Sequence, residues 1–574
     1  MPLTNAGIAA ELEEIADLLE VDQANPFRVR AYRSAARVVG ALPRNVADML
    51  AAGEQLDNLP GIGADLAEKI ATLARGESLP MLEALRTKLP RGVTALLGLP
   101  GLGPKRVHRL HEALGIDSVE KLRAALAAGA VAKLPGFGAA LATKLSATLA
   151  EGTGQKPRTL LASADEIVTL LLAALRKAPG VEQAEVAGSC RRRRETVGDL
   201  DLVVAAEDPG PVMQCFLGYD DVKEVLEQGS TRSSVVLRSA GLQVDLRVVG
   251  KTSYGAALLY FTGSRAHTIQ LRQMALDRGW KLNEYGLFKG ARRLSAETEE
   301  EIYERLGLRF IPPELREAEG EIEAARSGHL PSLIGVEDIR GDLHLHTDAT
   351  DGHATLDEMV RAAKARGYAY IAVTDHSRRM TMAHGLDAHR LSEQVTVIEK
   401  LNATLSGITV LAGIEVDILE DGSLDLPDSI LSRLDLVVGS IHTHFELSEK
   451  QQTERLLRAM DNRLLNIIGH PTGRLINKRA PYAIDMERVM RGALERGCHL
   501  EVNAQPERLD LDPHHCRLAK ELGVKLAIST DAHAPGDFAL MRYGVDQARR
   551  GWLGAADILN TRSLEGLRGL LARR

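Results

Sequence analysis

Apolar positions recur with different periods in different regions of the chain. Residues 12–19 read Leu-Glu-Glu-Ile-Ala-Asp-Leu-Leu, the spacing of an amphipathic helix. Apolar and polar residues alternate at 199–204 and 243–249, as in half-buried strands. Beyond residue 340, short apolar runs are separated by helical patterns, for example at 355–366 and 485–496. The order predicts a multidomain α/β protein that begins with helices and ends in alternating strands and helices.

A five-residue pattern, Leu-Pro-Gly-x-Gly, occurs at 59–63, 99–103 and 134–138, and helical patterns follow at 64–73, 104–114 and 139–149. A Gly-x-Gly turn that opens a helix exposes backbone N–H groups and the positive end of the helix dipole, and both attract phosphate. Each copy alone is also compatible with a tight turn between helices. As a set they resemble helix-hairpin-helix elements, which contact DNA backbones and, in that family, bind Na⁺ or K⁺. The glycines concerned are Gly61, Gly63, Gly101, Gly103, Gly136 and Gly138.

Residues 188–204, Gly-Ser-Cys-Arg-Arg-Arg-Arg-Glu-Thr-Val-Gly-Asp-Leu-Asp-Leu-Val-Val, combine four arginines with two alternating aspartates. On a strand, Asp199 and Asp201 point to the same face. The strand pattern at 243–249 offers a third carboxylate, Asp245. Three such acids can hold two divalent ions for phosphoryl transfer. The alternative is a polar strand edge with solvated acids.

Two further motifs, Tyr-Phe-Thr-Gly-Ser at 260–264 and Leu-Asn-Glu-Tyr-Gly at 282–286, follow in an order that resembles the family X DNA polymerases across residues 1–313. The resemblance implies a polymerase beta-like nucleotidyltransferase palm and thumb that fill gaps during base excision repair. It assigns Mg²⁺ or Mn²⁺ to Asp199, Asp201 and Asp245, and makes Asp245 the acceptor of the primer hydroxyl proton. It assigns the incoming dNTP to Gly188, Ser189, Arg192, Tyr260, Phe261 and Gly263, and the nascent pair and template to Arg272, Asn283, Glu284 and Tyr285. Arg265, His267 and Thr268 replace an Asp and an Asn of the family's animal repair members, so the minor-groove contact to the incoming base does not carry over.

The first 90 residues resemble the small lyase domain of the same family. Lys69 stands at the position of the lysine that forms a Schiff base with the 5′-deoxyribose phosphate, and a desolvated lysine can have its pKa lowered enough for this reaction. Tyr32 also matches, whereas Asp65 replaces a neighbouring family lysine. The alternative is a surface lysine on a DNA-binding helix.

Apolar runs in the last 240 residues or so end in histidines and carboxylates at 341–346, 371–376, 410–415, 437–442, 467–470 and 527–533. Strand-helix alternation with chemistry at the C-terminal strand ends describes a (β/α) barrel. The spacing resembles the PHP domain, the polymerase and histidinol phosphatase fold, a distorted seven-stranded barrel that binds about three metal ions. The resemblance assigns nine ligands: His344, His346, Asp351, His376, Glu415, His442, His470, Asp531 and His533. Mixed imidazole and carboxylate ligands suit Mn²⁺, Zn²⁺ or Fe²⁺. Five further histidines, at 353, 384, 444, 514 and 515, are expected on loops.

The boundaries that follow are 1–90 for a lyase-like helix-hairpin-helix domain, 91–155 for a fingers-like one, 156–262 for the palm, 263–313 for the thumb, 314–337 for an acidic linker and 338–574 for the PHP domain. The net charge of −7 does not identify a nucleic-acid binder, and the four scattered cysteines form neither a disulfide framework nor a thiolate zinc site. We expect a cytoplasmic monomer without membrane contact.

The combined reading is a bacterial repair polymerase with a metal-dependent 3′–5′ exonuclease and, in addition, AP endonuclease and lyase activity. Its expected partners are dNTP, gapped or primer-template DNA and single-stranded 3′ ends. Two alternatives concern the barrel: it is a small-molecule phosphomonoesterase, or it is a catalytically silent scaffold that positions DNA.

Overall fold

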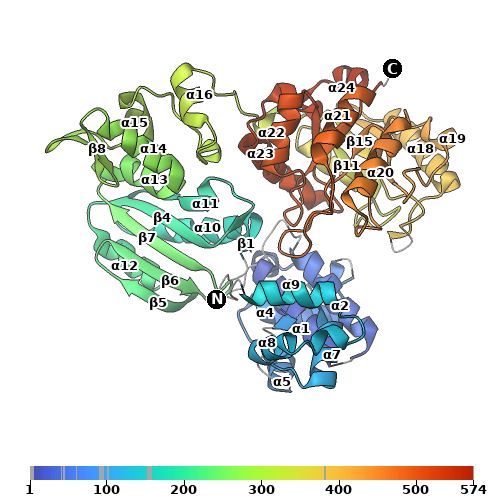
Figure 1. Cartoon of the computed structure of the whole chain (residues 1–574), viewed down its shortest axis with the longest axis horizontal. Coiled ribbons are helices and arrows are strands. Elements are labelled where there is room, and N and C mark those ends of the chain that lie inside the picture. Colours follow the sequence, from blue (N-terminus) through green and yellow to red (C-terminus); the bar gives the residue numbers. More distant parts are fainter. Residues whose placement is uncertain are drawn as a thin grey trace. The chain divides into compact units, whose positions relative to one another are not determined.

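A computed structural model describes residues 5–22, 24–40, 42, 46–59, 61–88, 96–97, 99, 102–150, 158–380 and 383–572. The chain divides into two compact units. The first holds residues 1–158 with the short pieces 219–224 and 237–242, and the second holds the remainder. The elements are labelled in Figure 1. Among the described residues, no helix is long and apolar enough to cross a membrane.

The N-terminal region is helical and has two apolar cores. The first is built around Ile15, Tyr32 and Ile70, and the second around Val107 and Phe137. The first group of helices is α1 (Asn5–Val21), α2 (Pro26–Gly40), α3 (Val46–Ala51), η1 (Leu56–Asn58), α4 (Ala64–Ala74) and α5 (Pro80–Lys88). The second is α7 (Pro104–Leu114), α8 (Val119–Ala127), η2 (Val131–Lys133) and α9 (Ala139–Ala150).

Among their described residues, the three glycine repeats make the same backbone hydrogen bond. In each, the residue between the two glycines donates its backbone N–H to the carbonyl of the leucine three positions earlier, at distances of 3.1, 2.9 and 3.0 Å. These middle residues, Ile62, Leu102 and Phe137, are buried and so anchor the turn in a core. Gly61 and Gly136 have φ values of 72° and 84°, which only glycine adopts readily. Gly101 lies outside the described residues.

The palm is a five-stranded sheet with the order β2-β4-β7-β6-β5. Its two central strands are parallel and place Asp201 opposite Asp245, while β2 and β6 pair antiparallel with them. The strands are β2 (Val181–Val186), β4 (Asp199–Ala206), β5 (Val222–Gln228), β6 (Arg232–Leu237) and β7 (Gln243–Val249), with a separate small pair formed by β1 (Thr159–Leu160) and β3 (Thr196–Val197). The palm helices are α10 (Leu161–Leu175), α11 (Gly188–Arg191), α12 (Pro209–Leu217), η3 (Lys251–Ser253) and α13 (Tyr254–Thr262).

The thumb combines α14 (Arg265–Leu276), the antiparallel strands β8 (Lys281–Asn283), β9 (Gly286–Lys289) and β10 (Arg292–Ser295), and α15 (Glu299–Arg305). The segment 314–337, expected to be a linker, differs from that expectation. It contains α16 (Glu321–Ser327) beside the short turns η4 (Pro313–Leu315) and η5 (Val336–Asp338), and its Leu315, Ile322 and Ala325 belong to the apolar core of the thumb. This segment is therefore integrated into the thumb.

The C-terminal part is a seven-stranded parallel sheet in chain order, and a bridge between Leu345 and Ala532 nearly closes it into a barrel. The strands are β11 (Gly341–Leu345), β12 (Tyr370–Val373), β13 (Thr409–Asp417), β14 (Leu436–Ser440), β15 (Ile467–Ile468), β16 (His499–Asn503) and β17 (Leu526–Ser529). The helices are α17 (Leu356–Ala365), α18 (Ala388–Asn402), α19 (Asp428–Leu431), α20 (Glu449–Asp461), α21 (Met486–Arg496), α22 (Pro513–Leu522), α23 (Met541–Arg550) and α24 (Leu564–Leu571). The predicted seven-stranded PHP barrel is confirmed.

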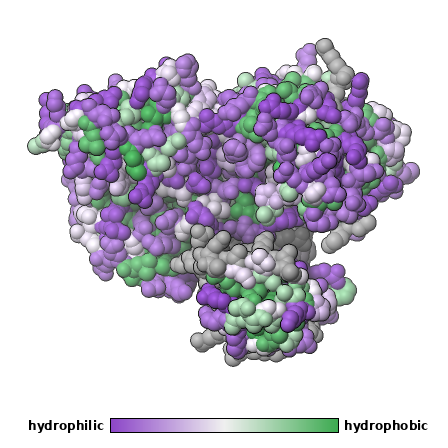
Figure 2. Space-filling view, in the orientation of Figure 1, coloured by the Kyte–Doolittle hydropathy of each residue, from purple (hydrophilic) through white to green (hydrophobic). Residues whose placement is uncertain are grey.

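Two apolar cores stabilise the barrel. The larger lies between the strands and the surrounding helices, and the smaller gathers Leu343, Leu411 and Leu436 with Leu567 and Leu571 of α24. Because apolar side chains fill these two cores, the predicted polar ligands of the barrel lie at or near the C-terminal ends of its strands. The outer surface in Figure 2 is mainly hydrophilic over the barrel and the palm, as expected when the apolar side chains fill the cores.

Candidate active sites

The palm carboxylates come together as the strand pattern predicted. Asp199 and Asp201 follow the two-residue period of β4, and Asp245 lies opposite Asp201 on β7. Burial, followed by repulsion from the other two aspartates, raises the pKa of Asp201 to about 7. Such repulsion between uncompensated carboxylates is relieved by a divalent cation, so the trio fits metal ions.

Hydrogen bonds orient Asp245 within this trio. Its carboxylate accepts from the hydroxyl of Ser234 on the neighbouring strand β6 and from Nε2 of Gln243 at 3.2 Å. Both donors lie within the palm sheet, so the position of this side chain is set by β6 and β7 themselves.

Gly188 permits the close approach of α11 to this trio. A Cβ atom added at residue 188 would lie 2.2 Å from Oδ2 of Asp201, and the φ of Gly188 is 59°. No other residue type can therefore occupy this position without moving Asp201.

The arginines that follow Gly188 are all held by named partners. Arg191 makes a bidentate pair with Glu299, at 2.6 and 3.0 Å. Arg192 donates to the backbone carbonyl of Thr262 at 2.5 Å and to Glu317 at 3.1 Å. The predicted dNTP ligand Arg192 is thus beside the α13–α14 junction, near the predicted dNTP residues Tyr260, Phe261 and Gly263.

Tyr260 and Phe261 occupy the last turn of α13, and Gly263 follows the helix with a φ of 67°. The guanidinium of Arg247 lies 5.0 Å from the ring centre of Phe261. Residues 260–263 therefore adjoin the β7 strand that carries Asp245.

The predicted template residues lie at the outer side of the thumb. Tyr285 is 55% exposed, and its N–H donates to Oδ1 of Asn283 at 3.0 Å. Arg272 is exposed on α14, and Glu284 is half-buried. These four side chains are therefore at least partly accessible to solvent.

His267, which replaces a family residue expected near the incoming base, is buried. Its Nδ1 lies 2.6 Å from Glu321 and its Nε2 lies 2.9 Å from the hydroxyl of Tyr303. Burial lowers the pKa of His267. The residue ties α14 to α16 and is unavailable to a base, which agrees with the missing minor-groove contact.

Lys69 forms an ion pair with Asp65 on the same helix, and its ammonium lies 5.8 Å from the ring centre of Tyr32. Burial lowers the pKa of Lys69, but hydrogen bonds to Asp65 and Tyr32 outweigh burial and raise it overall. The direction is opposite to that of a lysine activated by desolvation. In the same helical domain, Arg33 is paired with Asp17 and Glu20.

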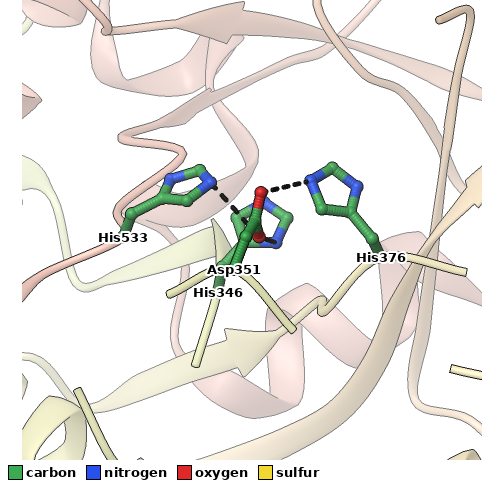
Figure 3. Close-up of side chains that lie close together, drawn as sticks. All are labelled: His346, Asp351, His376 and His533. Carbon is green, nitrogen blue, oxygen red and sulfur yellow. Dashed lines mark ion pairs between the residues drawn. The ribbon is translucent and has the colours of Figure 1, made fainter. Parts of the chain in front are cut away.

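The predicted ligands of the barrel converge in three groups whose potential ligand atoms lie within 4.8 Å of one another. The groups are His346, Asp351, His376 and His533; His344, His346 and Asp531; and His376, Glu415 and His442. The ninth residue, His470, places Nε2 3.0 Å from Oε1 of Glu415. Figure 3 shows Asp351 between His376 and His533, with His346 beside it. All nine predicted ligands are therefore at one place.

Several of these close approaches are not hydrogen bonds. Nδ1 of His376 lies 2.7 Å from Oε2 of Glu415, yet both atoms are buried without a hydrogen-bond partner. The same is true of His344 Nε2, which lies 3.6 Å from Glu415 Oε2. Buried imidazole nitrogens and carboxylate oxygens that converge in this way are arranged as ligands of a common cation, so the residues fit divalent metal ions.

Strong electrostatic coupling is a further property of this cluster. Burial alone would lower the pKa of His376, but Glu415 and Asp351 raise it to about 11. In the same way Asp351 and Asp531 raise the pKa of His533 to about 9. The buried carboxylates thus hold protons on the histidines, and bound metal ions would displace those protons.

Two supporting carboxylates were missed by the sequence analysis. Glu501 lies 2.7 Å from Nδ1 of His344, and Asp417 lies 3.0 Å from Nδ1 of His442. Glu501 is on β16, a strand that the sequence pattern does not reveal because no histidine or aspartate ends it. Asp417 could have been found, because it follows Glu415 by two residues and so shares its face of β13.

The additional histidines divide between loops and a helix. Residues 353, 384 and 444 are outside regular elements, as expected. His514 and His515 are in the first turn of α22, where Asp512 accepts the N–H of His515 as the helix N-cap. The expectation of a loop was wrong for these two, because Asp512-Pro513 is a helix start.

Profiles of four families match the chain. They are the helix-hairpin-helix domain at residues 3–79, the SAM-like helix-hairpin-helix tandem at 93–151, the DNA polymerase beta thumb at 257–317 and the PHP domain at 342–505. The matches cover the helical region, the thumb and the barrel in the predicted order.

Among individual relatives, DNA polymerase/3′-5′ exonuclease PolX of Bacillus subtilis (strain 168) is 37% identical over 565 residues, 98% of this chain and 98% of that protein. A probable phosphatase of Thermoanaerobacter sp. (strain X514) is 33% identical over 232 residues, 38% of this chain and 89% of its own length. A probable phosphatase of Caldanaerobacter subterraneus subsp. tengcongensis is 35% identical over 204 residues, 33% of this chain and 75% of its own length. The phosphatases match the PHP part alone. Because the first similarity runs through the helical region, the palm, the thumb and the barrel, the chain belongs to the PolX family, in which a polymerase beta-like core is joined to a PHP domain.

Proposed function

We propose that this protein extends DNA primers in the palm and removes nucleotides from 3′ ends in the barrel. The observation that carries the proposal is the presence of both sites in one chain: three carboxylates on two parallel strands, and a converging nine-residue ligand set. The full-length relative bears the name of both activities. The protein depends on divalent metal ions for both.

In the palm, Asp199, Asp201 and Asp245 would hold Mg²⁺ or Mn²⁺, which supply the charge that stabilises the transferring phosphate. Asp245 accepts the proton of the primer hydroxyl, because Ser234 and Gln243 keep its carboxylate oriented. Gly188 and Ser189 form the N-terminal turn of α11, which would contact the triphosphate.

Arg192 binds the triphosphate after leaving Glu317, its partner 3.1 Å away. The guanidinium of Arg192 then exchanges the carboxylate of Glu317 for a phosphate, so it is paired with an anion both before and after the nucleotide binds. Tyr260, Phe261 and Gly263 lie along the sugar, and Arg272, Asn283, Glu284 and Tyr285 support the nascent pair and the template.

In the barrel, the nine ligands would hold about three Mn²⁺, Zn²⁺ or Fe²⁺ ions, which supply an activated water and neutralise the phosphodiester. Arg508, whose Nε lies 4.0 Å from Oδ2 of Asp531, is suited to contact the phosphate of the 3′-terminal nucleotide. A silent scaffold is disfavoured because the complete ligand set converges. A small-molecule phosphomonoesterase is disfavoured because the phosphatase relatives lack the remainder of the chain.

The helix-hairpin-helix elements bind the DNA backbone through Gly61, Gly63, Gly101, Gly103, Gly136 and Gly138, with Na⁺ or K⁺ at the turns. The substrates are gapped or primer-template DNA, single-stranded 3′ ends and dNTP. The protein acts as a cytoplasmic monomer. AP endonuclease activity in the barrel and lyase activity at Lys69 stay predictions.

The two activities separate by mutation. Asp199→Ala with Asp201→Ala should abolish primer extension and leave degradation of a 3′-labelled single strand, while His344→Ala with Asp531→Ala should do the reverse. His389→Ala, which changes a barrel histidine with an 81% exposed side chain, is the matched control and should leave both activities unchanged. If the His344 and Asp531 variant degrades DNA like the wild type, the exonuclease assignment is wrong.

A further inference from the structure

Arg193, the third arginine after Ser189, connects the palm with the PHP domain inside the second compact unit. Its two terminal nitrogens donate to Asp165 of α10, both at 2.7 Å. Its Nε donates to Asp546 of α23 at 2.8 Å. The side chains of Arg193 and Asp546 are 20% and 14% exposed, so water screens this pair weakly.

The backbone around Arg193 links this ion pair to the predicted triphosphate residues. The N–H of Arg193 donates to the carbonyl of Cys190 at 2.9 Å, and the N–H of Arg194 donates to the carbonyl of Ser189 at 3.0 Å. Arg193 has a φ of 56°, a left-handed conformation that must be held by its surroundings. Fixing its guanidinium therefore fixes the turn that presents Ser189 and Arg192.

A second ion pair reaches the same loop. Glu195 accepts from Arg474, on the loop after His470, at 2.7 Å. Arg474 also donates to the backbone carbonyls of Arg508 and Leu509, and its side chain is 10% exposed. Its guanidinium is thus immobilised within the PHP domain and gives Glu195 a fixed anchor.

We propose that the PHP domain is a structural part of the nucleotide site of the polymerase. Asp546 and Arg474 act as positioning residues that hold residues 189–195 in the conformation that receives the triphosphate. The proposal rests on the proposed polymerase function, in which Ser189 and Arg192 contact dNTP. It assigns to the barrel a role in nucleotide binding that is separate from its own hydrolytic chemistry.

Asp546→Asn tests the first anchor, because it removes the charge on the PHP side and leaves the pair of Arg193 with Asp165. We expect the KM for dNTP in primer extension to rise about tenfold, since small displacements of binding groups have effects of this order, while kcat changes less than about twofold. Exonuclease activity should stay at the wild-type level. Glu195→Gln tests the second anchor, and it should also raise the KM for dNTP. Because Glu195 is half-buried, this variant keeps the test valid even if Asp546→Asn fails to fold.

The matched control is Glu314→Gln. It removes another carboxylate that pairs with α23, through Arg549 at 2.7 Å, but it does not touch residues 189–195. Its KM for dNTP should equal that of the wild type. An unchanged KM in both Asp546→Asn and Glu195→Gln, or an equal rise in Glu314→Gln, would overturn the proposal. Absence of primer extension in the wild-type protein would instead refute the polymerase function itself.

Discussion

Glu501 lies directly behind His344, with Oε1 2.7 Å from Nδ1 of the imidazole. Its second oxygen accepts the backbone N–H of His470, also at 2.7 Å. One carboxylate on β16 thus orients a ligand on β11 and the backbone of a ligand after β15. A carboxylate in this position fixes the tautomer of the histidine and directs Nε2 toward the metal.

Glu501→Gln should therefore weaken metal binding in the barrel by about 10- to 100-fold. The measurement is the metal content of the purified protein after dialysis against increasing chelator, by mass spectrometry. Glu507→Gln, a substitution of the same type at an ion pair with exposed Lys478, is the control and should retain metal like the wild type. Equal retention in the two variants would show that Glu501 does not support the site.

Gly188→Ala should abolish primer extension, because its Cβ would lie 2.2 Å from Oδ2 of Asp201 and displace that carboxylate. Gly241→Ala is a close control: Gly241 also has a φ of 59°, but nothing lies within 4 Å of its added Cβ. Both variants should lose about 1–3 kcal/mol of stability from backbone strain. A Gly188→Ala protein that extends primers at more than about a tenth of the wild-type rate would contradict the prediction.

The dependence of primer extension on Mg²⁺ should change with pH. The pKa of Asp201 is raised to about 7, so below pH 7 a metal ion must displace its proton. The Mg²⁺ concentration for half-maximal extension should then rise about tenfold for each pH unit between 7 and 5, and should level off above pH 8. Titrations at constant ionic strength measure this. A flat dependence between pH 5 and 7 would exclude a protonated Asp201 in the metal-free palm.

At Lys69, borohydride trapping on an AP-site substrate should disappear in Lys69→Ala. The nucleophile is the neutral amine, and the ion pair with Asp65 favours the ammonium form. Asp65→Asn should therefore increase trapping at neutral pH. Persistent trapping in Lys69→Ala would assign the reaction to another group.

Patterns with a fixed period were predictable from the sequence. The strand expected at 243–249 is β7 with those bounds, and the helices expected at 104–114 and 139–149 begin at the same residues as α7 and α9. Local periodicity and the Gly-x-Gly turns determine these elements. The strand β16 was missed because its run, His-Leu-Glu-Val-Asn, does not end in one of the residue types that mark the other strands.

Most ligand residues were predictable because they lie at the ends of apolar runs and match the pattern of the PHP domain, whereas their supports were not. Asp546 is 353 positions from Arg193 in the chain, and Glu321 is 54 positions from His267. No local pattern encodes such pairs, since they arise only when separate elements pack together. The acidic segment 314–337 was misjudged for the same reason: its charge suggested a solvated connector, but Glu321 is fully buried against His267.

The three ligand groups of the barrel share residues in a specific order. His346 belongs to the first two groups and His376 to the first and third, while the second and third groups have no member in common. An ion bound by His346, Asp351, His376 and His533 would therefore already hold His346, which belongs to the second group, and His376, which belongs to the third. The first group therefore connects the other two, and loss of its ion would leave one ligand of each neighbouring group less constrained.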